Sequence, residues 1–289
     1  MAIVYKDLKA WAFPEEVSAY TDNDCIRYAL SLGFAADPLN AKDLPFVHED
    51  GLRIVPTILA TIGSPGPWTQ DPRTGINWIK LLHGEQRMRF HRPLAVSGAA
   101  RSSTKVSRIV DKGEGKGALL VTERTVTDAE TGELLASIEN VSFCRADGGF
   151  ATPHAPGDAP LAPLPANPER DPDAVMVMPT AANAALLYRL NGDRNPIHAL
   201  PDAARKAGFD RPILHGLCTY GMAARAVIQS CCDGQSERMA SFSARFSSPV
   251  FPGETLRVEM WREEGQVSFR TLVVERGVVV LSHGVADIR

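Results

Sequence analysis

Apolar residues in the first half of the chain follow a helical spacing and then a series of alternating segments. Thr21 begins the helical stretch, because its side chain can cap a helix whose first turn is rich in acids, and Gly33 ends it. Four segments with the two-residue period of β-strands follow, separated by turn-rich stretches: 86–93, 103–110, 118–127 and 134–145. This order predicts a helix followed by an antiparallel meander.

The second half repeats this order. A helical pattern over residues 180–190 precedes three strand-like segments, 255–261, 267–275 and 278–287. The segment that begins at Arg245 matches the segment that begins at Arg89, at an offset of 156 residues (245 − 89), since both read Arg-Phe-x-x-Pro. A local match combined with the same order of elements predicts a duplicated module.

The two halves differ in one long helix. Residues 216–231 have an apolar helical face and several small residues, among them Gly221, which would let a curved sheet close around the helix. At the corresponding place the first half has only the short segment 55–62, which contains Pro56 near its start. We therefore expect the second half to supply the main helix of the core.

A proline-rich segment separates the halves. Residues 151–179 contain eight of the 21 prolines, which favours an extended path and keeps the segment out of a sheet interior. The predicted organisation is an N-terminal repeat over 1–150, a linker over 151–179 and a C-terminal repeat over 180–289.

Composition narrows the classes of partner. A net charge of −3 over 289 residues gives no basis for nucleic-acid binding, and no apolar run approaches the roughly 20 residues of a membrane span. The N-terminus lacks the pattern of a secretory signal, and the C-terminus lacks a peroxisomal Ser-Lys-Leu. The five cysteines form no Cys-x-x-Cys pair, as expected for free thiols in a reducing compartment. We expect a soluble cytoplasmic protein without a nucleic-acid or membrane partner.

Asp193 and His198 are the strongest candidates for chemistry. They lie five positions apart in a segment that Gly192 and Asn195-Pro196 make rigid. A carboxylate and a neutral imidazole around one water form a general acid/base pair, although a surface role for each residue is the alternative from spacing alone. No third and fourth ligand occur at a suitable spacing, so we expect no metal.

Two further features could bind an anion. Gly216 follows His215 at the start of the predicted long helix, where a free backbone amide could stabilise an oxyanion. The alternative is that Gly216 only eases the entry into the helix. Arg87 and Arg89 share a strand face and could meet phosphates, but a solvated face is the simpler interpretation. The chain has no glycine-rich nucleotide loop, nucleophile elbow or zinc-type cluster.

The segment 188–198, which reads Tyr-Arg-Leu-Asn-Gly-Asp-Arg-Asn-Pro-Ile-His, resembles the central motif of the hydratase 2 family of MaoC-like dehydratases. It departs from that motif conservatively, at Asn191 and Ile197. Other parts of the chain also look like family segments: 20–24, 82–86, 212–217 and 245–254. The resemblance therefore covers nearly the whole chain.

This resemblance implies an α+β double hot-dog fold, in which each repeat is an antiparallel sheet around a helix. It implies a hydro-lyase that reversibly hydrates a trans-2-enoyl-CoA to an (R)-3-hydroxyacyl-CoA in fatty acid metabolism, such as β-oxidation. Asp193 and His198 would be the catalytic pair, Asn195 would support them by hydrogen bonding, and the Gly216 amide would stabilise the oxyanion.

The first repeat has Gly33 and Pro38 at the places of the pair (offset 160, from 193 − 33), so it is expected to be catalytically empty and to contribute the acyl and CoA pocket. Its shortened helix would leave room for the acyl chain. Arg89, Arg245 and His215 are expected to contact the CoA thioester, which is the substrate. No separate cofactor is expected, and the resemblance implies a homodimer.

Three alternatives remain open from the sequence. The first is a dehydratase or hydratase of a specialised acyl-CoA with a dicarboxylic, aromatic or steroid side chain. The second is a thioesterase on the same fold. The third is a non-catalytic module that binds acyl-CoA or a partner.

Overall fold

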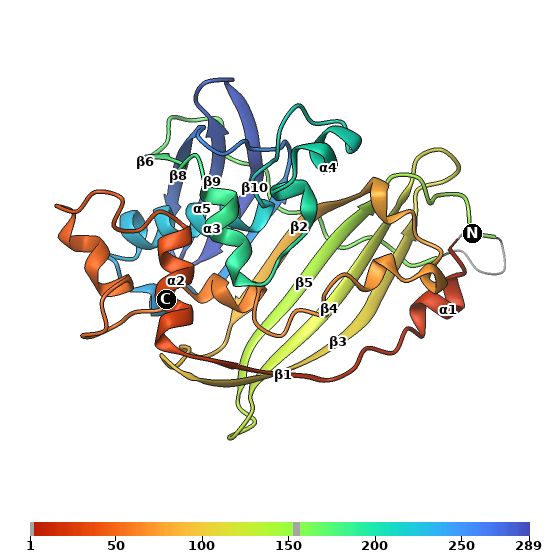
Figure 1. The fold of residues 1–289 in the computed structure, drawn as a ribbon, viewed down its shortest axis with the longest axis horizontal. Helices are drawn as coiled ribbons and strands as arrows, with labels where there is room; N and C mark the ends of the chain where they lie inside the picture. Colours follow the sequence, from red (N-terminus) through yellow and green to blue (C-terminus); the bar gives the residue numbers. More distant parts are fainter. Residues whose placement is uncertain (1–2, 153–156) are drawn as a thin grey trace.

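The computed structural model describes residues 3–152 and 157–289 (Figure 1). Within these residues ten strands form one sheet: β1 Glu16–Tyr20, β2 Leu81–Phe90, β3 Gly98–Asp111, β4 Ala118–Asp128, β5 Leu134–Cys144, β6 Ala174–Pro179, β7 Ser241–Phe246, β8 Thr255–Glu263, β9 Gln266–Val273 and β10 Val278–Asp287. In the same ranges five α-helices accompany it: α1 Tyr5–Lys9, α2 Asp22–Ser31, α3 Ala184–Tyr188, α4 Pro201–Lys206 and α5 Gly216–Cys231. Three 3-10 turns concern the site: η2 Pro56–Ala60, η6 Arg189–Asn191 and η7 Pro196–His198.

The strand order shows the duplication directly. The sheet runs β1-β3-β4-β5-β2-β7-β10-β9-β8-β6, so the last five strands repeat the arrangement of the first five about its centre. At that centre β2 and β7 are antiparallel, and Arg87 pairs with Ser243, 156 positions later (243 − 87). This is the offset found in the sequence, and a pseudo-twofold axis passes through the pair. The predictions of a duplicated module and of an α+β double hot-dog fold are confirmed.

Helices α2 and α3 are equivalent in the two repeats and pack against each other. The Tyr28 and Tyr188 rings have centroids 6.1 Å apart. Asn191 donates to the Ser31 hydroxyl at 2.9 Å, across a separation of 160 residues. Equivalent positions of the two repeats therefore meet at the axis, and the loop after α3 is held against the first repeat.

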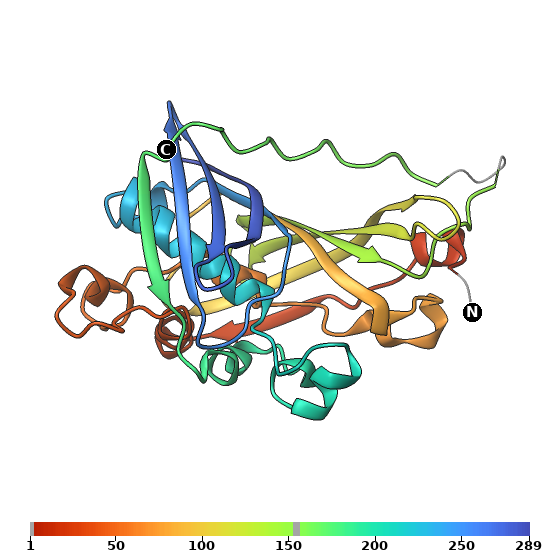
Figure 2. The same ribbon diagram turned by 90° about the horizontal axis from the view of Figure 1, so that it is seen from above.

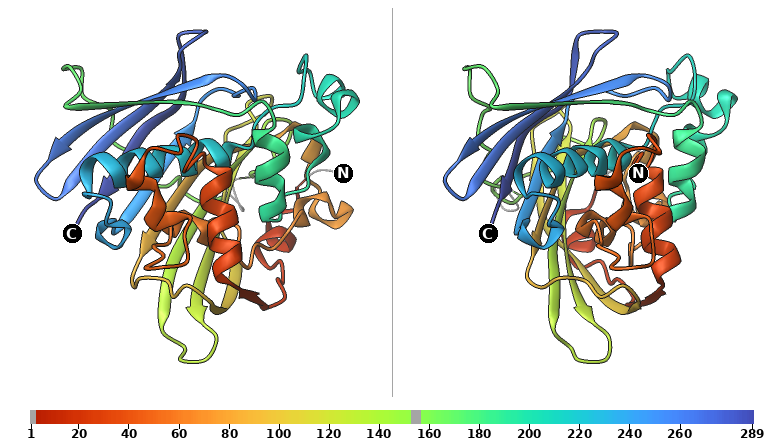
Figure 3. Two further views of the ribbon diagram at one scale, coloured as in Figure 1. Left: turned by 60° about the vertical axis from the view of Figure 1, so that its left-hand side comes forward. Right: turned by 90° about the vertical axis from the view of Figure 1, so that its left-hand side faces the viewer.

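The α5 helix fills the core, and its bounds are those predicted from the sequence. Its middle is almost fully buried, and α2, α3 and α5 lie on the same side of the sheet (Figure 3). Gly221 permits the close approach of α2, because a Cβ there would lie 2.6 Å from Leu32 Cδ2 and 3.0 Å from the Tyr28 hydroxyl. The first repeat has only η2 at the equivalent place, as expected.

The proline-rich segment is irregular over most of its described length, but its end forms a strand. Residues 157–173 are not assigned to a helix or strand and run along the face of the sheet away from α5, which we call the outer face (Figure 2). However, residues 174–179 form β6, which was not predicted. It is an edge strand that pairs with β8 alone. Pro179 is the last residue of the strand, and a proline is tolerated at an edge strand because one side of that strand makes no ladder hydrogen bonds. Residues 153–156 of the predicted linker lie outside the described residues.

The short strand β1 was also missed, because its five residues alternate between partly and largely exposed positions until Tyr20. It is the counterpart of β6 at the opposite edge of the sheet. None of the helices in the described part of the chain has the length and apolar character needed to cross a membrane.

We expect Gly221→Ala to destabilise the protein by about 1–3 kcal/mol, because the new methyl group overpacks against Leu32. Helix propensity alone would make the alanine variant more stable by about 1 kcal/mol. The sign of the change in unfolding free energy therefore shows whether packing or propensity dominates. Urea unfolding measures the difference. Leu32→Ala should relieve the overlap, and the double variant should then be less destabilised than the sum of the two single variants. Additive effects would contradict this close contact.

Candidate active site

Two local turns fix the loop between α3 and His198. Gly192 ends η6 with φ at +117°, a conformation that glycine readily adopts. The Asp193 carboxylate accepts a hydrogen bond from the Asn195 amide at 3.0 Å, and the Asn195 side chain accepts one from the Ile197 amide at 3.2 Å. The second bond caps η7, which ends at His198. The sequence Asp-x-Asn-Pro thus places both titratable side chains through its own hydrogen bonds.

His198 is held as a neutral imidazole with one free nitrogen. Its Nδ1 lies 2.8 Å from the Ile213 carbonyl oxygen. Because a carbonyl only accepts, Nδ1 carries the hydrogen and Nε2 keeps a lone pair. Only 9% of the residue is exposed. Burial lowers the pKa of His198 from its usual 6.5, more than the Ile213 carbonyl and Asp193 raise it. The ring is therefore a proton acceptor at neutral pH.

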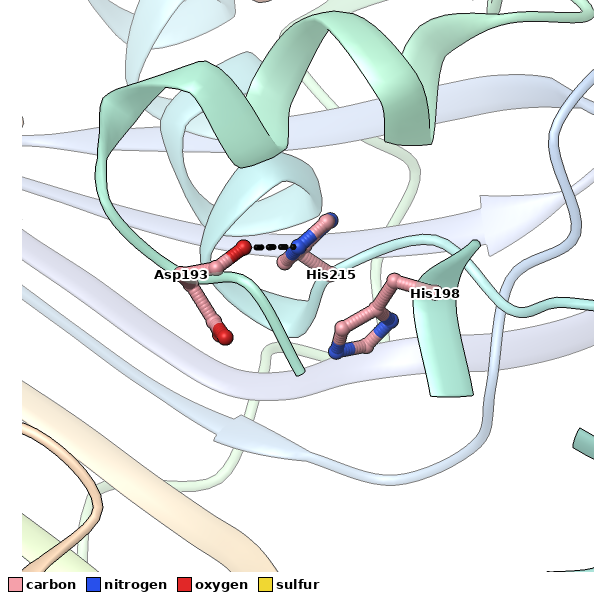
Figure 4. A group of neighbouring side chains, drawn as sticks. All are labelled: Asp193, His198 and His215. Carbon is pink, nitrogen blue, oxygen red and sulfur yellow. Dashed lines mark hydrogen bonds between the residues drawn. The ribbon is translucent and has the colours of Figure 1, made fainter. Parts of the chain in front are cut away.

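His215 lies directly against this ring. The two imidazoles stack with centroids 3.7 Å apart, and His215 Nε2 donates to the Asp193 carbonyl oxygen at 3.1 Å (Figure 4). Burial, followed by the neighbouring His198, lowers the pKa of His215 to about 4. His215 Nδ1 is buried without a hydrogen-bond partner among the described residues. A neutral His215 thus supports the Asp193 main chain and packs under His198.

The three side chains converge on one space. Each of Asp193, His198 and His215 offers a nitrogen or oxygen atom, and these atoms all lie within 4.8 Å of one another. Asp193 is exposed, whereas the two histidines are buried. In Figure 4 the Asp193 carboxylate and the His198 ring point into the same space from the two sides of the loop. The exposed Asp193 carboxylate thus lies within 4.8 Å of the buried His198 ring.

The amino end of α5 borders this site. The Cys218 and Thr219 amides both bond to the His215 carbonyl, so the Gly216 and Leu217 amides are the first-turn donors without an intrahelical partner. They carry the positive end of the helix dipole. A Cβ on Gly216 would lie 3.1 Å from the Phe246 ring, so packing also requires glycine here. Both sequence interpretations of Gly216 are compatible with this geometry.

The spacing argument against a third metal-type ligand was wrong. His215 is distant from His198 in the sequence but lies beside it in the fold. The two rings stack with centroids 3.7 Å apart and their planes only 26° apart, so their lone pairs lie in nearly parallel planes rather than in planes that cross at a common ligand position. The geometry fits a metal poorly, and a metal-free site stays a prediction.

Arg89 and Arg245 lie on the outer face of the sheet. Arg245 forms an ion pair with Glu85 at 2.8 Å, and Arg89 lies 3.5 Å from Asp287. The structure does not bring these arginines to Asp193, whereas it does bring His215. Their contacts with CoA remain a prediction.

Sequence reasoning gave no role to two aromatic rings beside the site. The His83 ring lies 4.4 Å from the Phe246 ring, which contacts Gly216. Burial lowers the pKa of His83 to about 4, and its Nε2 has no hydrogen-bond partner among the described residues. The family-like segment 82–86 was the available signal, but only the pairing of β2 with β7 brings His83 to the second repeat.

Comparison with protein families finds two matches that together span most of the chain. Residues 18–146 match the MFE-2 hydratase 2 N-terminal domain, and residues 164–283 match the MaoC-like domain. The boundary between the matches falls in the proline-rich segment.

Individual proteins are similar over nearly the full length. Enoyl-CoA hydratase ChsH3 of Mycobacterium tuberculosis is 38% identical over 276 residues, which cover 94% of this chain and 93% of that protein. The crystal structure of a MaoC-like dehydratase from Phytophthora capsici has a TM-score of 0.86 at 32% identity and covers 99% of both chains. Peroxisomal multifunctional enzyme type 2 from Drosophila melanogaster has a TM-score of 0.82 at 36% identity, but this chain spans 48% of its length.

The lowered pKa of His215 predicts a loss of stability in acid. The unfolded chain takes up the proton near pH 6.5, whereas the folded state resists it until about pH 4. The free energy of unfolding should therefore fall as the pH decreases through this window, by up to about 1.4 kcal/mol per pH unit for this histidine.

His215→Gln should reduce that slope, measured by urea unfolding at pH 7, 6 and 5. His48→Gln, at an exposed site, is the matched control and should leave the slope unchanged. An equal slope in wild type and His215→Gln would contradict a buried neutral His215.

Proposed function

Because the chain belongs to the family of MaoC-like dehydratases and hydratase 2 enzymes and is thus a hydro-lyase, we propose that it reversibly hydrates trans-2-enoyl-CoA thioesters to (R)-3-hydroxyacyl-CoA. The observation that carries this proposal is the shared space between the Asp193 carboxylate and the free nitrogen of His198, next to an unpaired helix-end amide. Water addition to a conjugated thioester needs these three functions: a base, an acid and a donor to the carbonyl oxygen.

The Gly216 amide would bind the thioester oxygen. Adding water to C3 moves negative charge onto this oxygen in the transition state, and a fixed N–H donor at the positive end of a helix stabilises that charge. Since glycine has no side chain, the oxygen can approach the backbone closely. The neighbouring Phe246 and His83 rings beside Gly216, tilted by 45° to each other, would exclude bulk water and strengthen this interaction.

His198 would accept the proton of the attacking water. Its Nδ1–H bond to Ile213 directs the Nε2 lone pair into the site, and burial keeps the ring neutral. Oxygen then bonds to C3 while Asp193, in its protonated form, delivers a proton to C2. The proton on His198 returns to Asp193 across their common space, which restores the starting state. The reverse sequence dehydrates the hydroxyacyl thioester.

Asn195 would keep this geometry without touching the substrate. Its backbone N–H donates to the Asp193 carboxylate, and its side-chain oxygen caps η7, the turn that ends at His198. One residue therefore positions both members of the pair. The first repeat has Gly33 and Pro38 at the equivalent positions and offers no such pair. We propose one active site per chain, built by the second repeat and bordered by the first.

Asp193→Asn and His198→Gln should each lower kcat/KM for crotonyl-CoA hydration by at least about 100-fold, the usual contribution of a general acid or base. Loss of enoyl absorbance measures the rate. Asp202→Asn on the exposed face of α4 and His48→Gln at an exposed site are matched controls and should retain wild-type activity. Unchanged hydration in both site variants would disprove the proposed pair. Release of free CoA thiol instead of hydration would identify a thioesterase.

A further inference from the structure

The side of the first repeat's sheet that faces the helices carries two separate apolar clusters. One continues the core around α5 and includes Met88, Ile138 and Val126. The other closes the far end of the sheet beneath α1 and includes Val106 and Leu120. A single hot-dog core would be continuous, so the residues that divide the clusters require an explanation.

Strand register identifies the dividing residues. One cross-strand row runs from Met88 through Ile138 and Arg124 to Thr104, and the next runs from Gln86 through Asn140 and Thr122 to Val106. Directly paired residues point to the same face of a sheet, so these side chains share the helix-facing side with both apolar clusters. We call the following six residues the polar belt: Gln86, Thr104, Thr122, Arg124, Asn140 and Ser142.

Four of the six residues of the polar belt are partly exposed although the belt lies on the core side. Thr104, Thr122, Asn140 and Ser142 are partly exposed, whereas Met88 on the same face is buried. Asn140 links the belt by accepting the Ser142 hydroxyl at 3.2 Å and donating to Gln86 at 3.5 Å. Within the described part of the chain, the Thr104 and Thr122 hydroxyls have no side-chain or backbone hydrogen-bond partner.

The polar belt begins next to the proposed thioester site. His83 is the cross-strand partner of Ser142, and its ring lies 4.4 Å from Phe246, which contacts the position of Gly216. From β2 the belt continues over β5 and β4 to β3, a span of roughly 14 Å for three strand spacings. An acyl chain that extends from the thioester into the first repeat therefore runs along these polar side chains.

A buried cation completes the polar belt. The Arg124 guanidinium donates to the carbonyl oxygens of Leu59, Ala60 and Ile62 at 2.6 to 3.0 Å, and the residue is 6% exposed. Burial lowers its pKa to about 10, so it is positive at neutral pH. Among the described residues no carboxylate lies within ion-pair distance of it, so its positive charge favours a negative or strongly polar group nearby.

We propose that the polar belt is the acyl-chain subsite and selects chains that carry an oxygen substituent, a hydroxyl or a terminal carboxylate, over plain alkyl chains of equal length. This inference rests on the proposed function. A plain alkyl chain would displace water from the threonine hydroxyls and Asn140 and leave them unpaired, whereas an oxygenated chain would replace those hydrogen bonds. The carboxylate would additionally compensate the charge of Arg124.

The test compares kcat/KM for four thioesters: crotonyl-CoA, 2-octenoyl-CoA, 8-hydroxy-2-octenoyl-CoA and 2-octenedioyl-CoA. Crotonyl-CoA reports hydration itself, because its chain is too short to reach far along the belt. We expect the two oxygenated octenoyl thioesters to exceed octenoyl-CoA by at least about tenfold. A higher kcat/KM for 2-octenedioyl-CoA than for 8-hydroxy-2-octenoyl-CoA would indicate that Arg124 recognises the carboxylate. Equal kcat/KM values for these two thioesters would indicate that the threonine hydroxyls and Asn140 recognise the oxygen substituent.

Thr122→Val and Asn140→Leu should each lower the ratio of oxygenated to plain octenoyl hydration by about tenfold or more. Thr125→Val is the matched control, since it makes the same replacement three residues along β4 at an exposed position, and it should leave the ratio unchanged. A wild-type enzyme that hydrates octenoyl-CoA as well as its oxygenated analogues, or a ratio unaffected by Thr122→Val, would overturn the inference. Failure to hydrate any of the four thioesters would instead overturn the proposed function.

Discussion

The pairing of β2 with β7 is the interaction on which the rest of the structure depends. It joins two five-stranded repeats into one sheet at a register in which Arg87 meets its own equivalent, Ser243. The same pairing brings His83 of the first repeat against Phe246 of the second, directly beside the amino end of α5. Without it the loop that carries Asp193 and His198 would lack its opposite wall, so the proposed active site is a property of the fused pair of repeats.

Duplication allowed the repeats to specialise. The second repeat keeps the long central helix, whose first-turn amides at Gly216 and Leu217 have no intrahelical partner. The first repeat keeps only η2, whose carbonyls are bonded by Arg124 from the sheet below. The helix-facing side that a full helix would have covered is partly open, and it is lined by the polar belt. Under the proposed function, the second repeat carries out the addition of water and the first repeat selects the acyl chain.

Periodicity and short motifs in the sequence predicted the features of the structure that depend on neighbouring residues in the chain. The bounds of α5 and most strands of both meanders followed from periodicity, although β2 begins and ends earlier than the predicted segment 86–93 and β7 was not predicted as a strand. A short motif predicted that the backbone around Asp193 and Asn195 is rigid. Tertiary partners could not be read in the same way. The stacking of His215 on His198 depends on how two loops meet, and the ion pair of Arg245 with Glu85 depends on strand register between repeats. The edge strand β6 was hidden by the prolines around it, since the exposed side of an edge strand tolerates them.

The stereochemistry of crotonyl-CoA hydration tests the central claim most directly, because a single fixed acid/base pair beside one oxyanion donor presents water to only one face of C3. Chiral analysis of the 3-hydroxybutyryl-CoA formed by the purified protein is the required measurement. The proposed function predicts the (R) product alone. A racemic mixture would contradict a single site in which Asp193, His198 and the Gly216 amide act on one bound thioester, and the (S) product alone would contradict the proposed (R)-specific hydration.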